Sequence, residues 1–191
     1  MTYYDQNAEL FFSGTVEVDM APVYQRFIPL LNDGASILDA GCGSGRDTLY
    51  FHKAGFAVTA FDLSEQLVEL ARQHTSLPIQ QCAFTRFEST TQYDGIWACA
   101  SLLHVSLSEL PETLEHLSSY LKPKAVFYCS FKYGDKEVVK GGRRFTNLTE
   151  SSLLTVLEGT PLEVKEVWQT GDQRPDRVEE RWLNALLIKK G

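Results

Sequence analysis

The residues best suited to ligand chemistry lie between Asp39 and Asp47, where the sequence reads D-A-G-C-G-S-G-R-D. An apolar run precedes this stretch, and an apolar pattern with helical spacing follows it from about Thr48. Glycine is needed where the backbone takes a positive φ or approaches a ligand closely. The N-terminus of a helix offers unpaired N–H groups to polar or anionic ligand groups. The stretch therefore predicts a strand, a tight turn and a helix that together bind a nucleotide-like ligand.

The spacing of the glycines separates two kinds of nucleotide-binding turn. The dinucleotide fingerprint G-x-G-x-x-G uses its third glycine to pack the helix against the sheet. Here Gly41, Gly43 and Gly45 stand at alternate positions, and the place of that third glycine holds Arg46. A carboxylate, Asp39, precedes the first glycine by two positions. The spacing opposes a dinucleotide site, and a purely structural glycine turn is the alternative.

A second acid, Asp62, directly follows an apolar run over residues 56–61. A carboxylate at the end of a second strand suits a ribose diol, because two hydroxyl donors need a two-oxygen acceptor. Dehydrogenases share this feature, so Asp62 indicates a nucleoside ligand without choosing between enzyme families. The alternative is a turn aspartate that caps the next helix. We expect Leu63 to face the adenine ring.

A histidine, His104, follows the apolar segment 93–100 and its short connection. Open α/β sheets bind their ligands at the carboxyl ends of the strands, where His104 would lie. The ordinary pKa of histidine suits a base near neutral pH. Packing within a loop is the alternative for His104. The other three histidines fall on expected helices and are assigned to the surface.

The elements that position these residues follow from periodicity. We expect strands over about 35–39, 56–61, 77–81, 93–100, 125–131, 162–168 and 181–188, with two helices before the first strand and helices between most of the others. Such alternation predicts a parallel sheet with α/β architecture. The short link over 170–177 predicts a terminal hairpin, so the last strand should be antiparallel. Residues 132–145 are expected to form a charged, glycine-bearing loop.

Length and composition limit the classes of function. The 191 residues are expected to form a single domain, 1–191, with 43% hydrophobic content. No apolar run reaches the roughly 20 residues of a membrane helix, and the N-terminus lacks a secretion signal, so a cytoplasmic location without membrane attachment is expected. The formal charge of −7 argues against binding nucleic acid through its phosphates. The four cysteines have no C-x-x-C spacing, so we expect reduced thiols and no metal.

The stretch D-A-G-C-G-S-G-R-D resembles motif I of the class I S-adenosylmethionine-dependent methyltransferases, and residues 93–100 resemble the fourth-strand segment of that family. G-C-G-S-G-R-D and A-S-L-L-H are also similar to small methyltransferases of tellurite resistance and ubiquinone biosynthesis. The resemblance implies a Rossmann-like fold. Its seven-stranded sheet would have the order 3-2-1-4-5-7-6, with the last strand antiparallel and helices on both faces.

The resemblance also implies S-adenosyl-L-methionine as cofactor and S-adenosyl-L-homocysteine as product. The residues expected to bind the cofactor are Asp39, Gly41, Cys42, Gly43, Gly45, Arg46, Asp62, Leu63, Ala83, Phe84 and Ala100. Arg46 would pair with the methionine carboxylate. Many family members carry an acid after the third strand, whereas this chain has none there, so adenine would be held by Phe84 and backbone groups. In this family N-terminal helices often cover the cofactor, and residues 1–31 would form such a lid.

The implied reaction is in-line transfer of a methyl group to a small-molecule acceptor. A hydroxyl or ammonium acceptor needs a base, and His104 is the candidate for that base or for a hydrogen bond to the acceptor. Tyr4, Arg143 and Arg177 are the candidate acceptor contacts, and the arginines favour an anionic acceptor. Ion pairing of these arginines with neighbouring acids on a solvated face is the alternative.

Two other classes of function stay open. A binding module that keeps the fold and binds S-adenosylmethionine or a nucleotide without catalysis would have the same sequence features. An NAD-dependent oxidoreductase is opposed by Arg46 and by the lack of residues for a substrate domain. The identity of the acceptor and the oligomeric state are not encoded in any motif.

Overall fold

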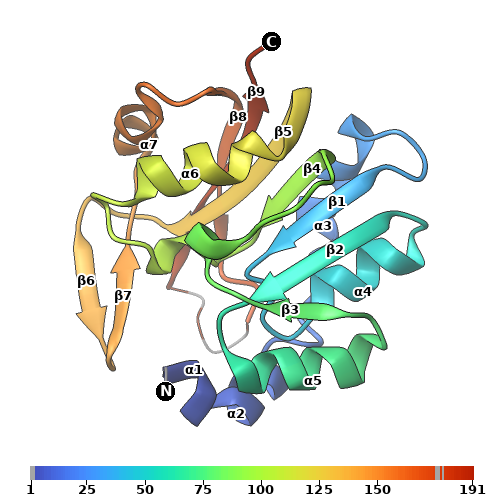
Figure 1. The fold of residues 1–191 in the computed structure, drawn as a ribbon. Helices are drawn as coiled ribbons and strands as arrows, with labels where there is room; N and C mark the ends of the chain where they lie inside the picture. The colour runs from blue at the N-terminus through green and yellow to red at the C-terminus, as the bar shows by residue number, and fades with distance from the viewer. Residues whose placement is uncertain (1–2, 175–176, 178) are drawn as a thin grey trace.

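A seven-stranded sheet forms the centre of the computed structural model, which describes residues 3–174, 177 and 179–191 (Figure 1). Its strands are β1 (Ser36–Ala40), β2 (Ala57–Asp62), β3 (Ile79–Gln81), β4 (Tyr93–Ala98), β5 (Leu121–Lys132), β8 (Leu162–Gly171) and β9 (Arg181–Lys189). Their order is β3-β2-β1-β4-β5-β9-β8. The first five strands are parallel, and β9 is antiparallel to both β5 and β8. Because β8 and β9 are the sixth and seventh strands of this sheet, the expected order and the antiparallel last strand are confirmed.

Helices cover both faces of the sheet, as expected. On one face lie α3 (Ala21–Phe27), α4 (Arg46–Lys53) and α5 (Glu65–Thr75), and on the other lie α6 (Leu110–Ser119) and α7 (Glu150–Leu157). Successive side chains of β4 enter different cores, since Ile96 packs with Leu114 of α6 whereas Trp97 packs with Phe51 of α4. A strand that is buried on both faces has a continuous apolar sequence, which explains why β4 could be predicted as a strand from its apolar run.

The parallel strands β2, β1 and β4 bring their carboxyl ends to one edge of the sheet. Ala40 pairs with Phe61, and Asp39 pairs with Trp97, so the glycine turn, Asp62 and the segment after β4 meet there. The short helices η2 (Phe84–Arg86) and η3 (Leu102–His104) follow β3 and β4 at the same edge. Open α/β sheets bind their ligands at such an edge.

The segment 132–145, expected to be a loop, contains a β-hairpin instead. Its strands are β6 (Glu137–Lys140) and β7 (Arg143–Thr146), which form a separate antiparallel pair beside the main sheet (Figure 1). Gly141 and Gly142 connect the strands with φ values of 58° and 73°, as a two-residue hairpin turn requires. All four residues of β6 are exposed, so this strand has no alternation of buried and exposed residues that a sequence pattern could reveal.

The chain begins with two short helices, α1 (Tyr3–Gln6) and α2 (Ala8–Ser13), and a 3-10 turn, η1 (Ile28–Leu30), follows α3. Asp5 lies within α1, and its carboxylate accepts a hydrogen bond from Ser64 Oγ at 2.7 Å. The contact ties α1 to the start of α5. Within the described part of the chain, no helix combines the length and apolar character needed to cross a bilayer.

Candidate functional site

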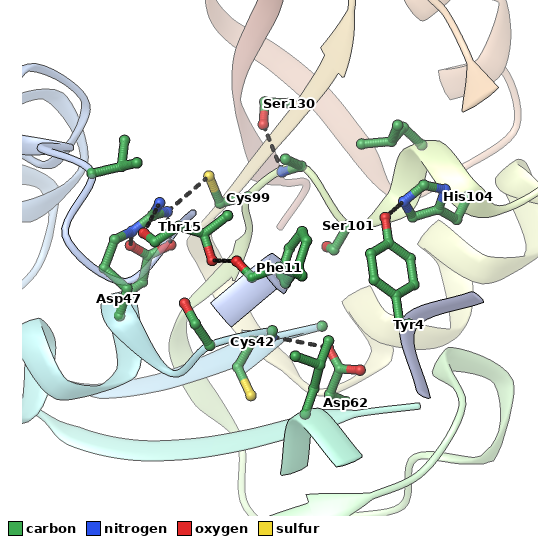
Figure 2. Close-up of a pocket in the computed structure, with 18 of the residues that line it drawn as sticks. Tyr4, Phe11, Thr15, Cys42, Asp47, Asp62, Cys99, Ser101, His104 and Ser130 are labelled. Atoms are coloured by element: carbon green, nitrogen blue, oxygen red, sulfur yellow. Dashed lines mark hydrogen bonds and ion pairs between the residues drawn. The ribbon is translucent and has the colours of Figure 1, made fainter. Parts of the chain in front are cut away.

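A cavity of about 590 Å³ lies at the carboxyl edge of the sheet (Figure 2). Its walls come from the glycine turn, the ends of β2, β4 and β5, the helices α1 and α2, the hairpin strand β7 and the turn between β8 and β9. Ligand pockets for small molecules commonly have volumes of about 300–1,000 Å³. The cavity therefore has room for a nucleoside-sized ligand and a small second molecule.

The glycine turn forms one wall and leaves backbone close to the cavity. Gly41, Gly43 and Gly45 all have φ between 54° and 76°, a region that glycine tolerates. A Cβ on Gly41 would lie 2.5 Å from Ser101 Cβ, and one on Gly43 would lie 3.1 Å from Phe11. The backbone N–H groups of Gly41 and Cys42 donate to the Phe61 carbonyl, which fixes the turn against the end of β2.

Asp62 is held with its carboxylate at the cavity. Its Oδ2 accepts from the Gly43 N–H and its Oδ1 from the Ser64 N–H, both at 2.9 Å. Burial raises the pKa of Asp62, and these backbone hydrogen bonds oppose the shift. Each oxygen retains a lone pair for a further donor, so the geometry suits a pair of ribose hydroxyls.

Asp39 lies beneath the turn rather than in the cavity wall. It is 2% exposed, and its Oδ2 accepts from Thr48 Oγ1 at 2.5 Å. Burial and the charge of Asp47 raise its pKa. Neither Asp39 nor Gly45 lines the cavity, whereas the other residues expected to bind the cofactor do. For these two, the geometry favours a role in shaping the turn over direct contact.

Arg46 lines the cavity and is fixed by its neighbour Asp47. Arg46 donates from Nε and Nη2 to the two oxygens of Asp47, at 2.7 and 2.9 Å. The same carboxylate accepts from Tyr24 Oη at 2.5 Å and from Trp97 Nε1 at 2.8 Å. Arg46 Nη1 has only a 3.4 Å contact to the Thr15 carbonyl. This nitrogen is the part of the guanidinium best able to reach an anionic group of a ligand.

The opposite side of the turn has the apolar groups expected around adenine. Leu63, Cys82, Ala83 and Phe84 line the cavity there, and Leu63 is 55% exposed. Among the described residues that line this side of the cavity near η2, Asp62 is the only one with a carboxylate. The side chains present are suited to holding a planar ring by packing.

The segment after β4 is strained and hydrogen-bonded. Ala100 has φ of 51°, a left-handed conformation that costs a non-glycine residue about 1–2 kcal/mol. Its N–H donates to Ser130 Oγ at 2.8 Å, and Ser101 Oγ donates to the Ala40 carbonyl at 2.7 Å. These contacts join β1, β4 and β5 where a ligand would pass between them. Strain of this kind is common at ligand sites.

The N-terminal helices lie over the cavity. Tyr4 of α1 and Phe11 of α2 line it, and their rings meet at 5.0 Å between centroids. Figure 2 shows Tyr4 directed toward His104, and the Tyr4 hydroxyl lies 2.6 Å from His104 Nε2. Both short helices therefore contribute side chains to the cavity wall, and their role as a lid over a bound cofactor stays a prediction.

His104 is partly buried and hydrogen-bonded through both ring nitrogens. Its Nδ1 lies 2.7 Å from the Arg144 carbonyl, which can only accept, so Nδ1 carries the proton. Nε2 then accepts from Tyr4. Burial lowers the pKa of His104, as do the charges of Arg143 and Lys132, while the bond to the Arg144 carbonyl opposes them. The lowered pKa favours the neutral imidazole of His104.

A basic wall faces the glycine turn across the cavity. It comprises Lys132, Arg143, Arg144, Arg174 and Arg177. Most of these cations have acidic partners: Arg174 pairs with Asp172, Arg144 with Glu137, and Lys132 and Arg177 with Glu180. Arg143 and Arg177, the expected acceptor contacts, both line the cavity, and the alternative of pairing with neighbouring acids is present for most of the basic wall.

Arg143 differs from the rest of the basic wall. The described residues offer it no carboxylate within ion-pair distance, and its buried Nε has no hydrogen-bond partner among them. Its guanidinium stacks on Tyr3 at 4.1 Å and lies 5.1 Å from the Phe145 ring centroid. A stacked guanidinium keeps its N–H edges available for a carboxylate.

Several lining residues were not anticipated from sequence. Four separate parts of the chain supply these residues and meet only through the fold: Phe11 with Thr15, then Asp47, Ser130 and Asn184. The one local signal was the acid that follows Arg46 in G-R-D. The others belong to segments whose pattern indicated only strands or helices.

Comparisons with known proteins agree with this geometry. A family model described as a methyltransferase domain matches residues 12–140. The malonyl-[acyl-carrier protein] O-methyltransferase of Pectobacterium atrosepticum is 29% identical, over 49% of this chain and 49% of that protein. The chain therefore spans about half the length of this curated relative.

Two solved structures are similar in fold. The 1,6-didemethyltoxoflavin-N1-methyltransferase of Burkholderia thailandensis, solved with that compound and S-adenosylhomocysteine, gives a TM-score of 0.78 at 22% identity, over 98% of this chain and 84% of that one. A TehB-like S-adenosylmethionine-dependent methyltransferase of Corynebacterium glutamicum gives 0.74 at 21% identity, with 98% of each chain covered.

Proposed function

Because the chain belongs to the class I S-adenosylmethionine-dependent methyltransferases, we propose that it transfers a methyl group from S-adenosylmethionine to a small anionic acceptor. One observation carries this proposal: a single cavity joins the glycine turn and Asp62 on one side to Tyr4, His104 and the basic wall on the other. A methyl donor and an acceptor would therefore meet inside it.

The residues on the donor side fit S-adenosylmethionine. Asp62 has the acceptor capacity for both ribose hydroxyls, and a Cβ at Gly41 or Gly43 would fill the space beside the turn. Leu63 and Phe84 would pack on adenine, and Arg46 Nη1 would meet the methionine carboxylate. When bound, the donor supplies a methyl group on a positively charged sulfur, which leaves as a neutral thioether.

On the acceptor side, the chain's own task is alignment and exclusion of water. In-line displacement requires the acceptor atom to approach the methyl group from the side opposite sulfur. The α1 and α2 helices would cover the cavity from solvent, and the basic wall would orient a negatively charged acceptor. Arg143 is the best candidate for this contact because it has no acidic partner among the described residues. We propose a supporting role for Arg177.

The donor site is tested by calorimetric titration with S-adenosylhomocysteine and with NAD. We expect tight binding of S-adenosylhomocysteine and none of NAD. Asp62→Asn should weaken S-adenosylhomocysteine at least about tenfold, since a lost charge-assisted hydrogen bond is worth roughly 1.5–3 kcal/mol. Asp33→Asn, an exposed aspartate outside the cavity, is the control. Binding of NAD alone would contradict the proposal.

The acceptor class is tested by a screen for methyl transfer. The panel comprises hydroxybenzoates, the matching mercaptobenzoates, and the neutral methyl esters of both. We expect turnover of carboxylates in preference to esters, and Arg143→Gln should reduce that preference about tenfold or more. An equal preference in wild type would contradict an anionic acceptor while leaving methyl transfer intact. The cytoplasmic location stays a prediction of the sequence.

A further inference from the structure

His104 does not present a free nitrogen to the cavity. Its Nδ1–H donates to the Arg144 carbonyl at 2.7 Å. Its Nε2 accepts from the Tyr4 hydroxyl at 2.6 Å (Figure 2). A base that acts directly on an acceptor needs its lone pair directed at the acceptor proton. Here that lone pair is directed at Tyr4, so the polar group that α1 and η3 jointly offer to the acceptor is the Tyr4 oxygen.

The tautomer of His104 is fixed by the fold. The carbonyl of Arg144 belongs to β7, so the hairpin holds the proton on Nδ1 and leaves Nε2 as an acceptor. The ring also lies 5.3 Å from the Tyr4 ring and 5.2 Å from the Phe145 ring, between centroids. These contacts hold the imidazole against Tyr4.

We propose that Tyr4 contacts the acceptor and passes the acceptor's proton to His104, and therefore that the acceptor atom is a protonated oxygen or nitrogen. This inference rests on the proposed function. In the step, the acceptor atom forms a bond to the methyl carbon as the methyl–sulfur bond breaks and its electron pair stays on sulfur. The acceptor proton moves to the Tyr4 oxygen while the Tyr4 proton moves to His104 Nε2. The imidazolium then releases its proton to solvent.

Charges around the pair suit this transfer. Burial lowers the pKa of His104, as do the nearby charges of Arg143 of β7 and Lys132 of β5, and this favours a neutral imidazole whose Nε2 can accept a proton. Burial raises the pKa of Tyr4, Arg143 lowers it, and Asp62 and Tyr3 raise it. Arg143 thus favours the transient negative charge on the Tyr4 oxygen, and an acceptor carboxylate beside Arg143 would favour the positive charge on His104.

The first test needs no acceptor. The imidazole of His104 is titrated by NMR in protein saturated with S-adenosylhomocysteine, for wild type and Tyr4→Phe. A hydrogen bond donated to Nε2 stabilises neutral histidine, so the pKa of His104 should be below its ordinary value and should rise in Tyr4→Phe. Tyr50→Phe is the matched control, because Tyr50 stacks on Tyr24 outside the cavity. An unchanged His104 pKa in Tyr4→Phe would overturn the proposal.

The second test compares two nucleophiles. With hydroxybenzoates, Tyr4→Phe and His104→Asn should each slow methyl transfer about 100-fold, the lower range for loss of acid–base catalysis. With mercaptobenzoates at pH 9, where a thiol of ordinary pKa is mostly ionised, the loss should be less than about fivefold. His52→Asn, an exposed histidine on α4, is the control. The rate with hydroxybenzoates should also lose its acidic limb in His104→Asn.

The outcomes separate the two proposals. Equal losses with both nucleophiles would mean that the pair only positions the acceptor, and the relay would be wrong. No loss with hydroxybenzoates would also refute it. A wild type that binds S-adenosylhomocysteine but methylates only thiols would contradict the relay and leave methyl transfer standing. A wild type that does not bind S-adenosylhomocysteine would contradict the proposed function itself, whatever the His104 titration gives.

Discussion

Asp47 fixes the position of the Arg46 guanidinium at the cavity. Its buried carboxylate takes both hydrogen bonds of the Arg46 fork and two more from Tyr24 and Trp97. Burial works against the charged form of Asp47, but these partners together hold its pKa below the usual range. The guanidinium is consequently fixed with Nη1 as its available nitrogen.

This arrangement predicts a ligand-specific effect of Arg46→Lys. Lysine keeps the charge but loses the planar fork, so it cannot satisfy Asp47 and a ligand carboxylate together. S-adenosylhomocysteine should bind about tenfold more weakly, whereas methylthioadenosine, which lacks the amino-acid part, should bind unchanged. Calorimetric titration of both ligands measures this, with Arg26→Lys on α3 as control. Equal weakening of both ligands would remove Arg46 from the carboxylate site.

The raised pKa of Asp39 predicts that the free energy of unfolding falls as pH rises. Its folded-state pKa is raised, so the folded protein holds this proton more tightly than the unfolded chain does. The stabilisation is complete below the unfolded pKa of about 3.9 and is lost as pH rises through the folded pKa. Asp39→Asn keeps an acceptor for Thr48 and cannot ionise. Its free energy of unfolding should exceed that of wild type at pH 8 by about 1 kcal/mol or more, and the difference should shrink toward pH 4.

Urea unfolding at several pH values measures this difference, with exposed Asp33→Asn as control. S-adenosylhomocysteine affinity should change little in Asp39→Asn, because the carboxylate does not line the cavity. A large loss of affinity at unchanged fold would instead support the contact that the family resemblance implies.

The residues at the strand ends were predictable because their positions follow from local pattern. Asp62 and His104 each come after a buried apolar run, and parallel strands place such residues together. The Tyr4–His104 contact had no such basis, since it joins residues separated by 100 positions. This contact depends on how α1 packs against the rest of the protein, and the spacing of apolar residues in the sequence does not predict that packing.

At the scale of elements, the hairpin β6–β7 is the least predictable part of the site wall. Its base is held by Glu137, which accepts from the Leu107 N–H, from Arg144 and from Thr146. Its tip depends on two successive glycines with positive φ. The strands of the hairpin bury few apolar side chains. Its conformation therefore depends on the hydrogen bonds of Glu137 and on the two glycines of the turn.

Replacing both Gly141 and Gly142 by alanine should therefore open the hairpin without unfolding the domain. Hydrogen exchange followed by mass spectrometry should show lost protection over residues 137–146, with the global unfolding free energy changed by less than about 1 kcal/mol. Gly159→Ala is the control, since Gly159 also has positive φ and open space around it. Unchanged protection of the hairpin would show that its base contacts are sufficient.

Across the whole molecule, the parallel sheet and its terminal hairpin were predictable from the alternation of strands and helices, whereas the strand order was an implication of the family resemblance. The apolar runs of β1, β4 and β5 and the final hairpin carry most of that information. The depth of the cavity was not predictable from periodicity, since it depends on how distant segments pack around it, and a cover by the N-terminal helices was expected only from the family resemblance. The sequence thus specifies the scaffold more directly than the acceptor side.

The three clusters of buried apolar side chains take none of their members from residues 3–19 of the described chain. Those residues nevertheless supply Tyr3, Tyr4 and Phe11 to the cavity. Changes in α1 and α2 can therefore accumulate during evolution, or be introduced by exchange of the whole segment, with little effect on the stability of the sheet. Such changes would alter the cavity wall, and with it the range of accepted substrates, while the sheet stays the same, which makes this segment the natural place to diversify in a library.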